Sequence, residues 1–264
     1  MVDTVTCQHA MRKDVEMPAP TTVELLWGTQ QRPKRGPKPA LSLEGIVAEA
    51  IALADAEGLA NLSMQRLAER LGFTKMSLYR YVPGKDQLTA LMVDTALGAP
   101  PDIIAAQEDS KEESWRAGLR SWAETIFERY RAHPWSITLT VGVRAIGPNE
   151  MGWMNAALTA LDGTGLTGPE RLDTIVLLNG HIRSLVQQVT TGDRQDTARQ
   201  IAGQFAEMMA AAGDRFPLVS AAFAEEAAVT GAAPANEGPG DALSFGIDRI
   251  LDGLGVLIAD RRRP

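Results

Sequence analysis

The chain has 264 residues, of which 45% are hydrophobic and 22% are charged, so it can bury a sizeable core and is not a disordered protein. Its single cysteine and three histidines exclude an internal disulfide framework and the common zinc clusters. No apolar run approaches the roughly 18 residues that span a membrane, and residues 1–30 lack the apolar stretch of a secretion signal. We therefore expect a cytoplasmic protein with no metal, no cofactor and no membrane partner.

The formal net charge of -7 conceals an uneven distribution along the chain. Residues 1–97 hold 11 Lys and Arg against 11 Asp and Glu, which leaves 15 against 22 for residues 98–264. Between positions 66 and 85 the sequence has one acidic residue, Glu69. The basic residues of this segment are Arg66, Arg70, Lys75, Arg80 and Lys85. A locally positive segment joined to an acidic body is typical of a modular DNA-binding protein, although a solvated charged face has the same composition.

The N-terminal residues 1–40 are expected to form a disordered tail with a basic arm. Residues 1–31 are mixed and polar, and prolines interrupt them. Positions 32–39 read Arg-Pro-Lys-Arg-Gly-Pro-Lys-Pro, and these prolines exclude a helix. Arg35 and Lys38 are candidate DNA contacts. The arm is similar to those that enter the minor groove, although a solubilising tail has the same composition.

Residues 41–97 carry the pattern of a small helical domain. Apolar residues at helical spacing predict a helix from Leu43 to about position 57, with Ser42 as its N-cap and Gly58 as its stop. Ser63 opens a second, short helix that ends at Gly72. Thr74 caps a third helix to about Val82, and a fourth runs over about 86–97. Two short helices joined by a turn of about three residues form a helix-turn-helix.

The geometry of that motif separates core positions from outward ones. The N-terminal end of the third helix would present Thr74, Lys75, Met76 and Ser77 to base edges in the major groove. Other residues are candidates for contacts to DNA phosphates. They are Tyr79, Arg80, Lys85 and the start of the second helix around Gln65. A plain three-helix cluster with a charged outer face remains the alternative.

Residues 98–264 predict helices only. A long helix carries Trp115 to Tyr130 on one face and stops at Pro134. Further helices are expected at about 135–143, 150–162, 169–190, 195–212, 216–228 and 242–260, with a loop at 230–240. No alternating run argues for a strand. We therefore predict an all-α protein, with an N-terminal helix-turn-helix domain at 41–97 and a larger helical domain at 98–264.

The run Leu-Ala-Glu-Arg-Leu-Gly-Phe-Thr-Lys-Met-Ser-Leu-Tyr-Arg-Tyr-Val at 67–82, followed by Lys85, resembles the DNA-binding domain of the tetracycline-repressor family. Residues 112–260 resemble the C-terminal domain of that family less specifically. The resemblance implies a homodimer that binds a near-palindromic operator and releases it when a small molecule binds. It also implies phosphate contacts by Tyr79 and Lys85, base contacts by 74–77 and Gln65, and a four-helix dimer interface from helices near 169–190 and 241–259.

Aromatic and polar residues of the second domain are candidates for an effector pocket. Four of the five tryptophans lie between 115 and 153, and polar groups interrupt the apolar helix near 179–187. The candidate residues are Trp122, Phe127, Trp153, Asn179, His181 and Arg183. Ordinary core packing explains the aromatic residues equally well. A magnesium–tetracycline site is not expected, because Pro101 and Thr140 or Val141 stand where the resemblance requires histidines.

No nucleophile, metal cluster or phosphate loop points to catalysis, so we expect no enzyme and no catalytic residues. The sequence predicts a ligand-responsive, dimeric transcriptional regulator that represses by binding an operator. The alternative is a DNA-binding regulator that responds to a protein partner and has no small-molecule pocket.

Overall fold

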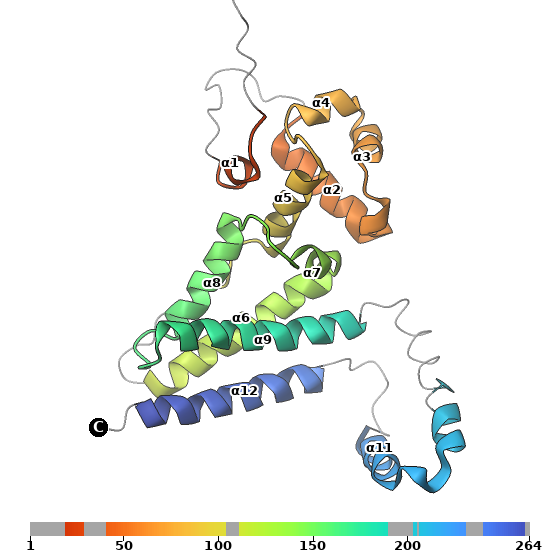
Figure 1. Cartoon of the computed structure of the whole chain (residues 1–264), viewed down its shortest axis with the longest axis vertical. Helices are drawn as coiled ribbons and strands as arrows, with labels where there is room; N and C mark the ends of the chain where they lie inside the picture. Colours follow the sequence, from red (N-terminus) through yellow and green to blue (C-terminus); the bar gives the residue numbers. More distant parts are fainter. Residues whose placement is uncertain are drawn as a thin grey trace, which may run out of the picture.

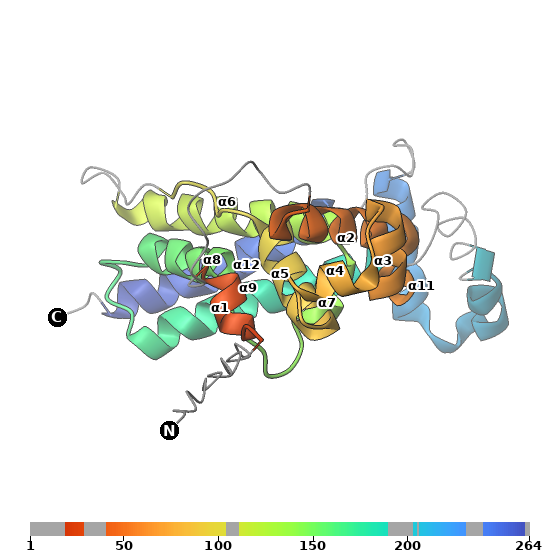
Figure 2. The same cartoon turned by 90° about the horizontal axis from the view of Figure 1, so that it is seen from above.

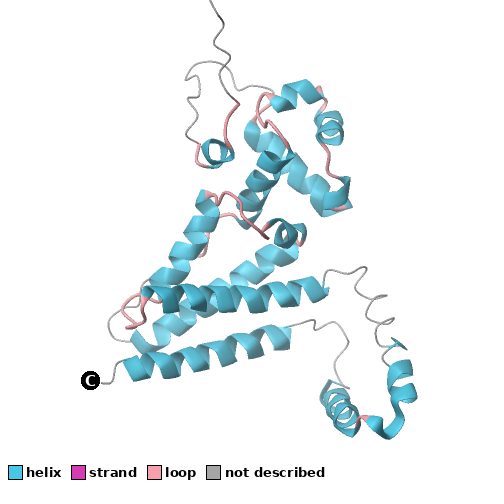
Figure 3. Ribbon diagram, viewed as in Figure 1, coloured by secondary structure: helices cyan, strands magenta, loops and turns pink. Residues whose placement is uncertain are grey.

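The computed structural model describes residues 19–28, 41–103, 111–189, 203–204, 206–230 and 240–261. Over these ranges all regular elements are helices and none is a strand (Figure 3), so the predicted all-α class is confirmed. A small head, formed by α2 to α5, stands on a larger body that contains α6 to α12 (Figure 1). None of the described helices is long and apolar enough to cross a membrane.

The head consists of α2 (Leu43–Glu57), the short η1 (Leu59–Asn61), α3 (Met64–Leu71), α4 (Lys75–Tyr79) and α5 (Lys85–Leu97). Each of the first three α-helices begins at the expected cap, where a hydroxyl oxygen accepts a backbone N–H three residues ahead at 3.0–3.2 Å. These caps are Ser42, Ser63 and Thr74. The core beneath them includes Ile46, Leu53, Leu62, Leu67, Leu78, Val82 and Leu88, all less than 3% exposed.

The turn between α3 and α4 explains the motif geometry. Gly72 has φ +73°, which the left-handed conformation requires and which a residue with a Cβ adopts only with strain. The third helix is shorter than expected, because α4 ends at Tyr79 instead of near Val82. Pro83 disfavours helical backbone at Val82. After α4 the backbone forms a turn, in which the Tyr81 N–H donates to the Leu78 carbonyl at 2.9 Å.

A short helix, α1 (Thr22–Leu26), lies within the segment expected to be a mobile tail, so that expectation is wrong for residues 21–27. Thr21 and Glu24 form a reciprocal capping box, and Leu25 and Leu26 are buried. The helix packs against α5, and the Trp27 Nε1 donates to the Ile146 carbonyl at 3.2 Å. Residues 1–18 and 29–40, including the basic arm, lie outside the described residues.

The body contains α6 (Lys111–Ala132), α7 (Trp135–Leu139), α8 (Pro148–Ala160), α9 (Gly168–Val189) and α12 (Gly240–Arg261). Helix α6 packs against both α8 and α9, and α9 runs beside α12 (Figures 1 and 2). An ion pair at 2.9 Å between Arg116 and Asp252 joins α6 to α12. Helix α7 ends four residues before the expected position 143, ahead of Gly142 with φ +89°.

The remaining described segment stands away from this packing. Residues 206–212 are helical, and η3 (Gly213–Arg215) leads into α11 (Pro217–Thr230). In both views α11 lies beyond the ends of α9 and α12 (Figures 1 and 2). Several large apolar side chains of this segment are exposed, namely Met208, Phe216, Leu218, Val219 and Phe223.

Candidate functional site

The outer end of α4 displays the predicted base-reading residues. Thr74, Lys75 and Met76 are exposed, and Met76 is 72% exposed, which is unusual for a large apolar side chain. The Thr74 and Ser77 hydroxyls hydrogen-bond one another at 2.9 Å, and Thr74 also caps the helix. Thr74 and Ser77 thus bond to one another at the start of the helix, where Lys75 and Met76 are exposed.

A cation–π contact braces the lysine of this surface. The Lys75 ammonium lies 5.5 Å from the centre of the Tyr79 ring, and Tyr79 itself packs against the core of the head. Arg80 follows directly and is exposed. The surface thus combines two cations with a phenol and two hydroxyls, which are groups that contact phosphates and base edges.

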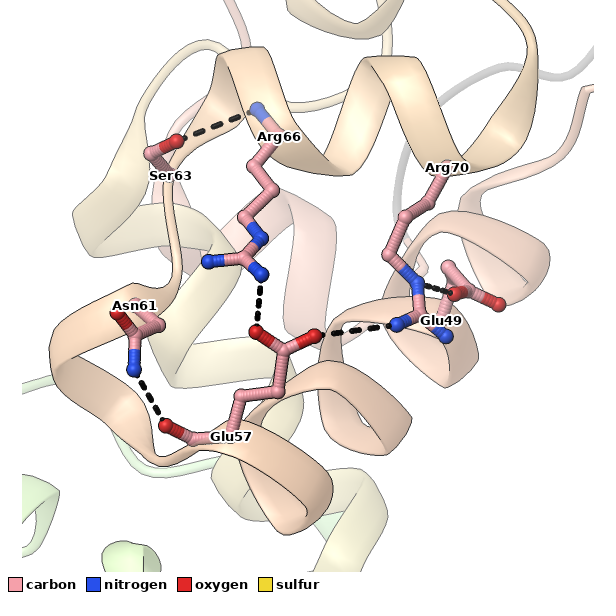
Figure 4. A network of polar contacts seen from close by, with 6 residues as sticks. All are labelled: Glu49, Glu57, Asn61, Ser63, Arg66 and Arg70. Atoms are coloured by element: carbon pink, nitrogen blue, oxygen red, sulfur yellow. Dashed lines mark hydrogen bonds and ion pairs between the residues drawn. The ribbon is translucent and has the colours of Figure 1, made fainter.

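The arginines of α3 contribute less positive charge than the sequence indicated. Figure 4 shows both of them directed at the glutamates of α2. Arg70 pairs with Glu49 at 2.5 Å and with Glu57 at 3.5 Å, and Arg66 pairs with the other oxygen of Glu57. Counting only Glu69 as their neighbouring acid was therefore wrong, because the partners lie on another helix. Among the described residues, no ion pair involves Lys75, Arg80 or Lys85, so the remaining positive charge of the head lies at α4 and at the start of α5.

Two further DNA-contact candidates take part in contacts within the head. The Gln65 Nε2 donates to the Glu69 Oε1 at 2.7 Å, four residues along α3. The Lys85 Nζ donates to the Leu62 carbonyl at 3.0 Å, which fastens the start of α5 to the residue before the α3 cap. Their DNA roles stay predictions. Arg35 and Lys38 lie outside the described residues.

A cavity of about 210 Å³ lies in the body beneath the end of α5. Its walls come from α5, α6, α8, α9 and the loop before α8. Four of the six predicted ligand residues line it, namely Trp122, Trp153, Asn179 and Arg183. The other lining residues are Leu97, Ile126, Tyr130, Thr140, Arg144, Ile146, Glu150, Met154 and Ile175.

The two remaining candidates do not line the cavity, and helix geometry explains both. Positions 122, 126 and 130 share one face of α6 at a spacing of four residues, so Phe127 is rotated away from the cavity and is buried in the core. Positions 179 and 183 likewise share one face of α9. His181 points elsewhere and abuts Gly246 of α12, with its Nε2 3.4 Å from the Leu243 carbonyl.

One wall of the cavity is polar, and the sequence did not single out two of its residues, Arg144 and Glu150. The Arg144 Nη1 lies 2.6 Å from the Glu150 Oε2, and the Glu150 side chain is only 8% exposed. Burial raises the pKa of Tyr130, while the charge of Arg183 and a hydrogen bond from Asn179 lower it. Tyr130 therefore presents a protonated hydroxyl at neutral pH.

The same wall is tied to the helix that leads to the head. The Glu150 backbone N–H donates to the Asp94 Oδ1 of α5 at 3.0 Å, and the Asn149 side chain donates to the Asp94 carbonyl at 3.0 Å. Burial raises the pKa of the Asp94 carboxyl, an effect that these hydrogen bonds oppose. The Trp153 Nε1 donates to the Gly98 carbonyl at 2.9 Å. These hydrogen bonds connect the cavity wall directly to the end of α5.

An exposed cationic helix-turn-helix on a helical body with a cavity is the architecture of a DNA-binding transcriptional regulator. Two family models match the chain: bacterial regulatory proteins of the tetR family over residues 46–92, and the tetracycline repressor-like C-terminal domain over residues 108–258. The HTH-type transcriptional repressor DrrR1 of Streptomyces coeruleorubidus is 39% identical over 255 residues, which cover 91% of this chain and 87% of the relative. The chain therefore belongs to the tetR family and is a DNA-binding transcriptional repressor, not an enzyme.

Solved structures have the same fold. ActR of Streptomyces coelicolor in complex with actinorhodin matches with a TM-score of 0.64 at 22% identity, over 84% of this chain and 99% of that chain. A tetracycline-repressor variant of Acinetobacter baumannii in complex with minocycline matches with a TM-score of 0.55 at 18% identity, over 83% and 98%. At these identities the likeness shows the fold alone.

Proposed function

We propose that the protein is a dimeric repressor that leaves its operator when a small molecule enters the cavity of the body. The observation that carries this proposal is the hydrogen bond between the backbone of Glu150, a cavity residue, and Asp94 of α5. Helix α5 also packs against α2 of the head. A ligand that displaces the start of α8 therefore acts on the element that orients the head.

On the DNA side, the N-terminal end of α4 would enter the major groove. Lys75 is suited to donate to guanine and Met76 to touch a thymine methyl group, with Thr74, Ser77 and Gln65 beside them. Tyr79, Arg80 and Lys85 would contact phosphates and set the position of the helix. The arginines of α3 are already paired, so Lys75, Arg80 and Lys85, which form no ion pair with the described residues, support this assignment.

A dimer would form through α9 and α12, the helices expected at 169–190 and 241–259. Both expose large apolar side chains, namely Leu172, Val176, Leu177, Phe245, Val256 and Leu257. Large apolar side chains exposed on two neighbouring helices suit an interface between copies of the chain. Two copies related by a two-fold axis would present their α4 helices to successive major grooves about 34 Å apart.

The effector would act by favouring a dimer in which that spacing is lost. A ligand shifts such an equilibrium only by its difference in affinity between the two conformations. Actinorhodin and minocycline, which are bound to two structural neighbours, are aromatic or partly aromatic molecules, and the tryptophan-lined wall here suits ligands of that kind.

The alternative, regulation by a protein partner, rests on a different surface. Phe216, Leu218 and Phe223 of the α11 segment are between 43% and 84% exposed, and a protein could bind there instead of a small molecule in the cavity. A small molecule that dissociates the DNA complex without any second protein separates the two functions.

The test places a duplex from the protein's own promoter region on a sensor surface and loads the purified protein. Actinorhodin and minocycline are then injected separately. Release by either compound supports the proposal, and a complex that persists with both, but dissociates with a protein fraction of the cell extract, supports the alternative. Val176→Glu should abolish the dimer in analytical ultracentrifugation, whereas Val143→Glu, the same change at a fully exposed loop position, should leave it intact.

A further inference from the structure

Two buried oxygen atoms of the cavity residues lack a hydrogen-bond partner. Among the described residues, four buried side-chain polar atoms have none, and two of these belong to residues that line the cavity: the Glu150 Oε1 and the Asn179 Oδ1. The other two, on Trp115 and Ser136, belong to residues outside the cavity lining. A buried acceptor without a donor is costly, so the cavity is incomplete at these atoms.

The partners of the two residues show which atoms remain. Glu150 uses its Oε2 for Arg144 and its backbone N–H for Asp94, so its Oε1 alone is left. For Asn179, the atom without a partner is the amide oxygen Oδ1. Both remaining atoms are acceptors. A ligand that satisfies them must therefore bring hydrogen-bond donors.

The charge of the same wall decides between neutral and cationic donors. The Glu150 carboxylate is already balanced by Arg144, and Arg183 adds a further positive charge to the lining. An ammonium group would be repelled by both guanidinium groups in a partly desolvated site. A hydroxyl or a neutral N–H meets the two acceptors without that repulsion.

The rest of the cavity determines the body of the ligand. Trp122 and Trp153 meet edge to face, with ring centres 6.1 Å apart at 70°. Their indole N–H groups are held by the carbonyls of Trp153 and Gly98, at 2.8 and 2.9 Å. With their polar atoms engaged, these side chains offer only aromatic surface. Ile126, Met154 and Ile175 complete an apolar wall that suits a planar ring.

We propose that the effector is a neutral aromatic molecule whose hydroxyl or N–H groups donate to the Glu150 Oε1 and the Asn179 Oδ1. This inference rests on the proposed function and names the chemical class that the cavity selects. It also explains how a ligand reaches α5. The atom that it binds belongs to the residue whose backbone N–H is held by Asp94.

The test measures binding to the full chain with three naphthalene probes of matched shape. Naphthol has a hydroxyl donor, methoxynaphthalene has only an acceptor, and aminomethylnaphthalene carries an ammonium group at neutral pH. The indole N–H signals of Trp122 and Trp153 in isotope-edited NMR report binding at the cavity. We expect naphthol to bind at least about tenfold more tightly than either of the other probes.

Glu150→Gln sharpens the test, because Arg144 retains an oxygen to bind and the cavity then meets an amide donor. In this variant naphthol should bind about tenfold more weakly, while methoxynaphthalene should bind at least as tightly as before and so report an intact fold. Glu128→Gln, the same change at an exposed position of α6 paired with Arg131, should alter neither affinity.

Equal affinity of naphthol and methoxynaphthalene would overturn the proposed donor contact, although the cavity would remain a ligand site. Preferential binding of aminomethylnaphthalene, or no binding of any probe up to its solubility limit, would overturn the neutral aromatic class. None of these outcomes bears on operator release, which the sensor experiment measures independently. Failure of this inference is thus distinguishable from failure of the proposed function.

Discussion

In the head, the arginines of α3 are paired with glutamates of α2, whereas in the body two buried oxygens of cavity residues on α8 and α9 lack a partner among the described residues. Within the described residues of the head, no buried side-chain polar atom lacks a partner, and α4 exposes Lys75 and Met76. In the described part of the body, four buried side-chain polar atoms lack a partner, and two of them belong to the cavity residues Glu150 and Asn179. A surface that reads DNA needs a fixed shape, while a site that senses a ligand needs groups that only the ligand completes.

Helix α5 connects these two regions. It packs against α2 in the head, and its Asp94 holds the start of α8 beside the cavity. Gly147 permits this approach, because a Cβ at that position would lie 2.2 Å from the Asp94 carboxylate. A small number of residues on α5 and at the start of α8 thus join the head to the body. Substitutions at these residues, in the head and in the body test the difference between the two regions.

Removing the Asp94 carboxylate should disturb the link most. Asp94→Ala leaves the buried Glu150 N–H without its acceptor, and we expect the free energy of unfolding to fall by about 1–3 kcal/mol. Chemical denaturation followed by circular dichroism measures this. A loss of less than about 0.5 kcal/mol, the lower end for a single hydrogen bond, would mean that the carboxylate does not hold α8 to α5.

Asp94→Asn keeps an acceptor oxygen and separates geometry from charge. Because burial raises the pKa of Asp94 above its ordinary value of 3.8, the folded protein binds this proton more tightly than the unfolded chain. The stabilisation that the Asp94 carboxyl contributes is thus fully present below pH 3.8, and it is lost as the pH rises through the raised pKa. The stability of the variant relative to the native protein should therefore increase as the pH rises from the ordinary pKa of an aspartate through the raised pKa of Asp94. A difference independent of pH would contradict the burial of a titrating carboxyl.

On the head, Lys75→Ala should relax the preference at one base pair by about 1–3 kcal/mol. Arg70→Ala is the matched control, because Arg70 is already paired with Glu49 and Glu57 and should leave the preferred sequence unchanged. Selection from random DNA measures both. If the lysine variant selected the same sequence as the native protein, Lys75 would have no part in base reading.

Trp27→Phe tests the unexpected α1, which contacts both regions. The change removes the indole donor to the Ile146 carbonyl but keeps an aromatic ring. Because Trp27 is 45% exposed, we expect a loss of stability of about 1 kcal/mol at most. Denaturation curves of the two proteins show the difference. A variant that unfolds at an unchanged denaturant concentration would leave α1 without a role in joining head and body.

Glu57→Gln should have the smallest effect on stability. Its ion pairs with Arg66 and Arg70 are partly exposed, so their loss should cost less than about 1 kcal/mol. The same change releases positive charge on α3, so binding to a shuffled duplex should become tighter and more dependent on salt. Unaltered non-specific binding would show that these arginines lie outside the reach of DNA.

Local signals account for what could be predicted. The caps at Ser42, Ser63 and Thr74 and the turn at Gly72 depend on neighbouring residues, so the head could be described from the sequence. Contacts between segments far apart in the sequence could not be predicted in this way. The pairing of Arg70 with Glu49, the burial of α1 and the meeting of Glu150 with Asn179 in one wall all depend on packing. Four-residue spacing along α6 and α9 could have separated Phe127 and His181 from the cavity residues.

The most direct test of the central claim, that α4 is a sequence-reading surface, is a fluorescence-anisotropy titration of the purified protein. It compares a duplex from the protein's own promoter region with a shuffled duplex at several salt concentrations. We expect tight binding to the promoter duplex that weakens with salt, and at least about a thousandfold weaker binding to the shuffled one. Equal, weak binding to both duplexes would contradict the assignment of α4 to operator recognition at this promoter.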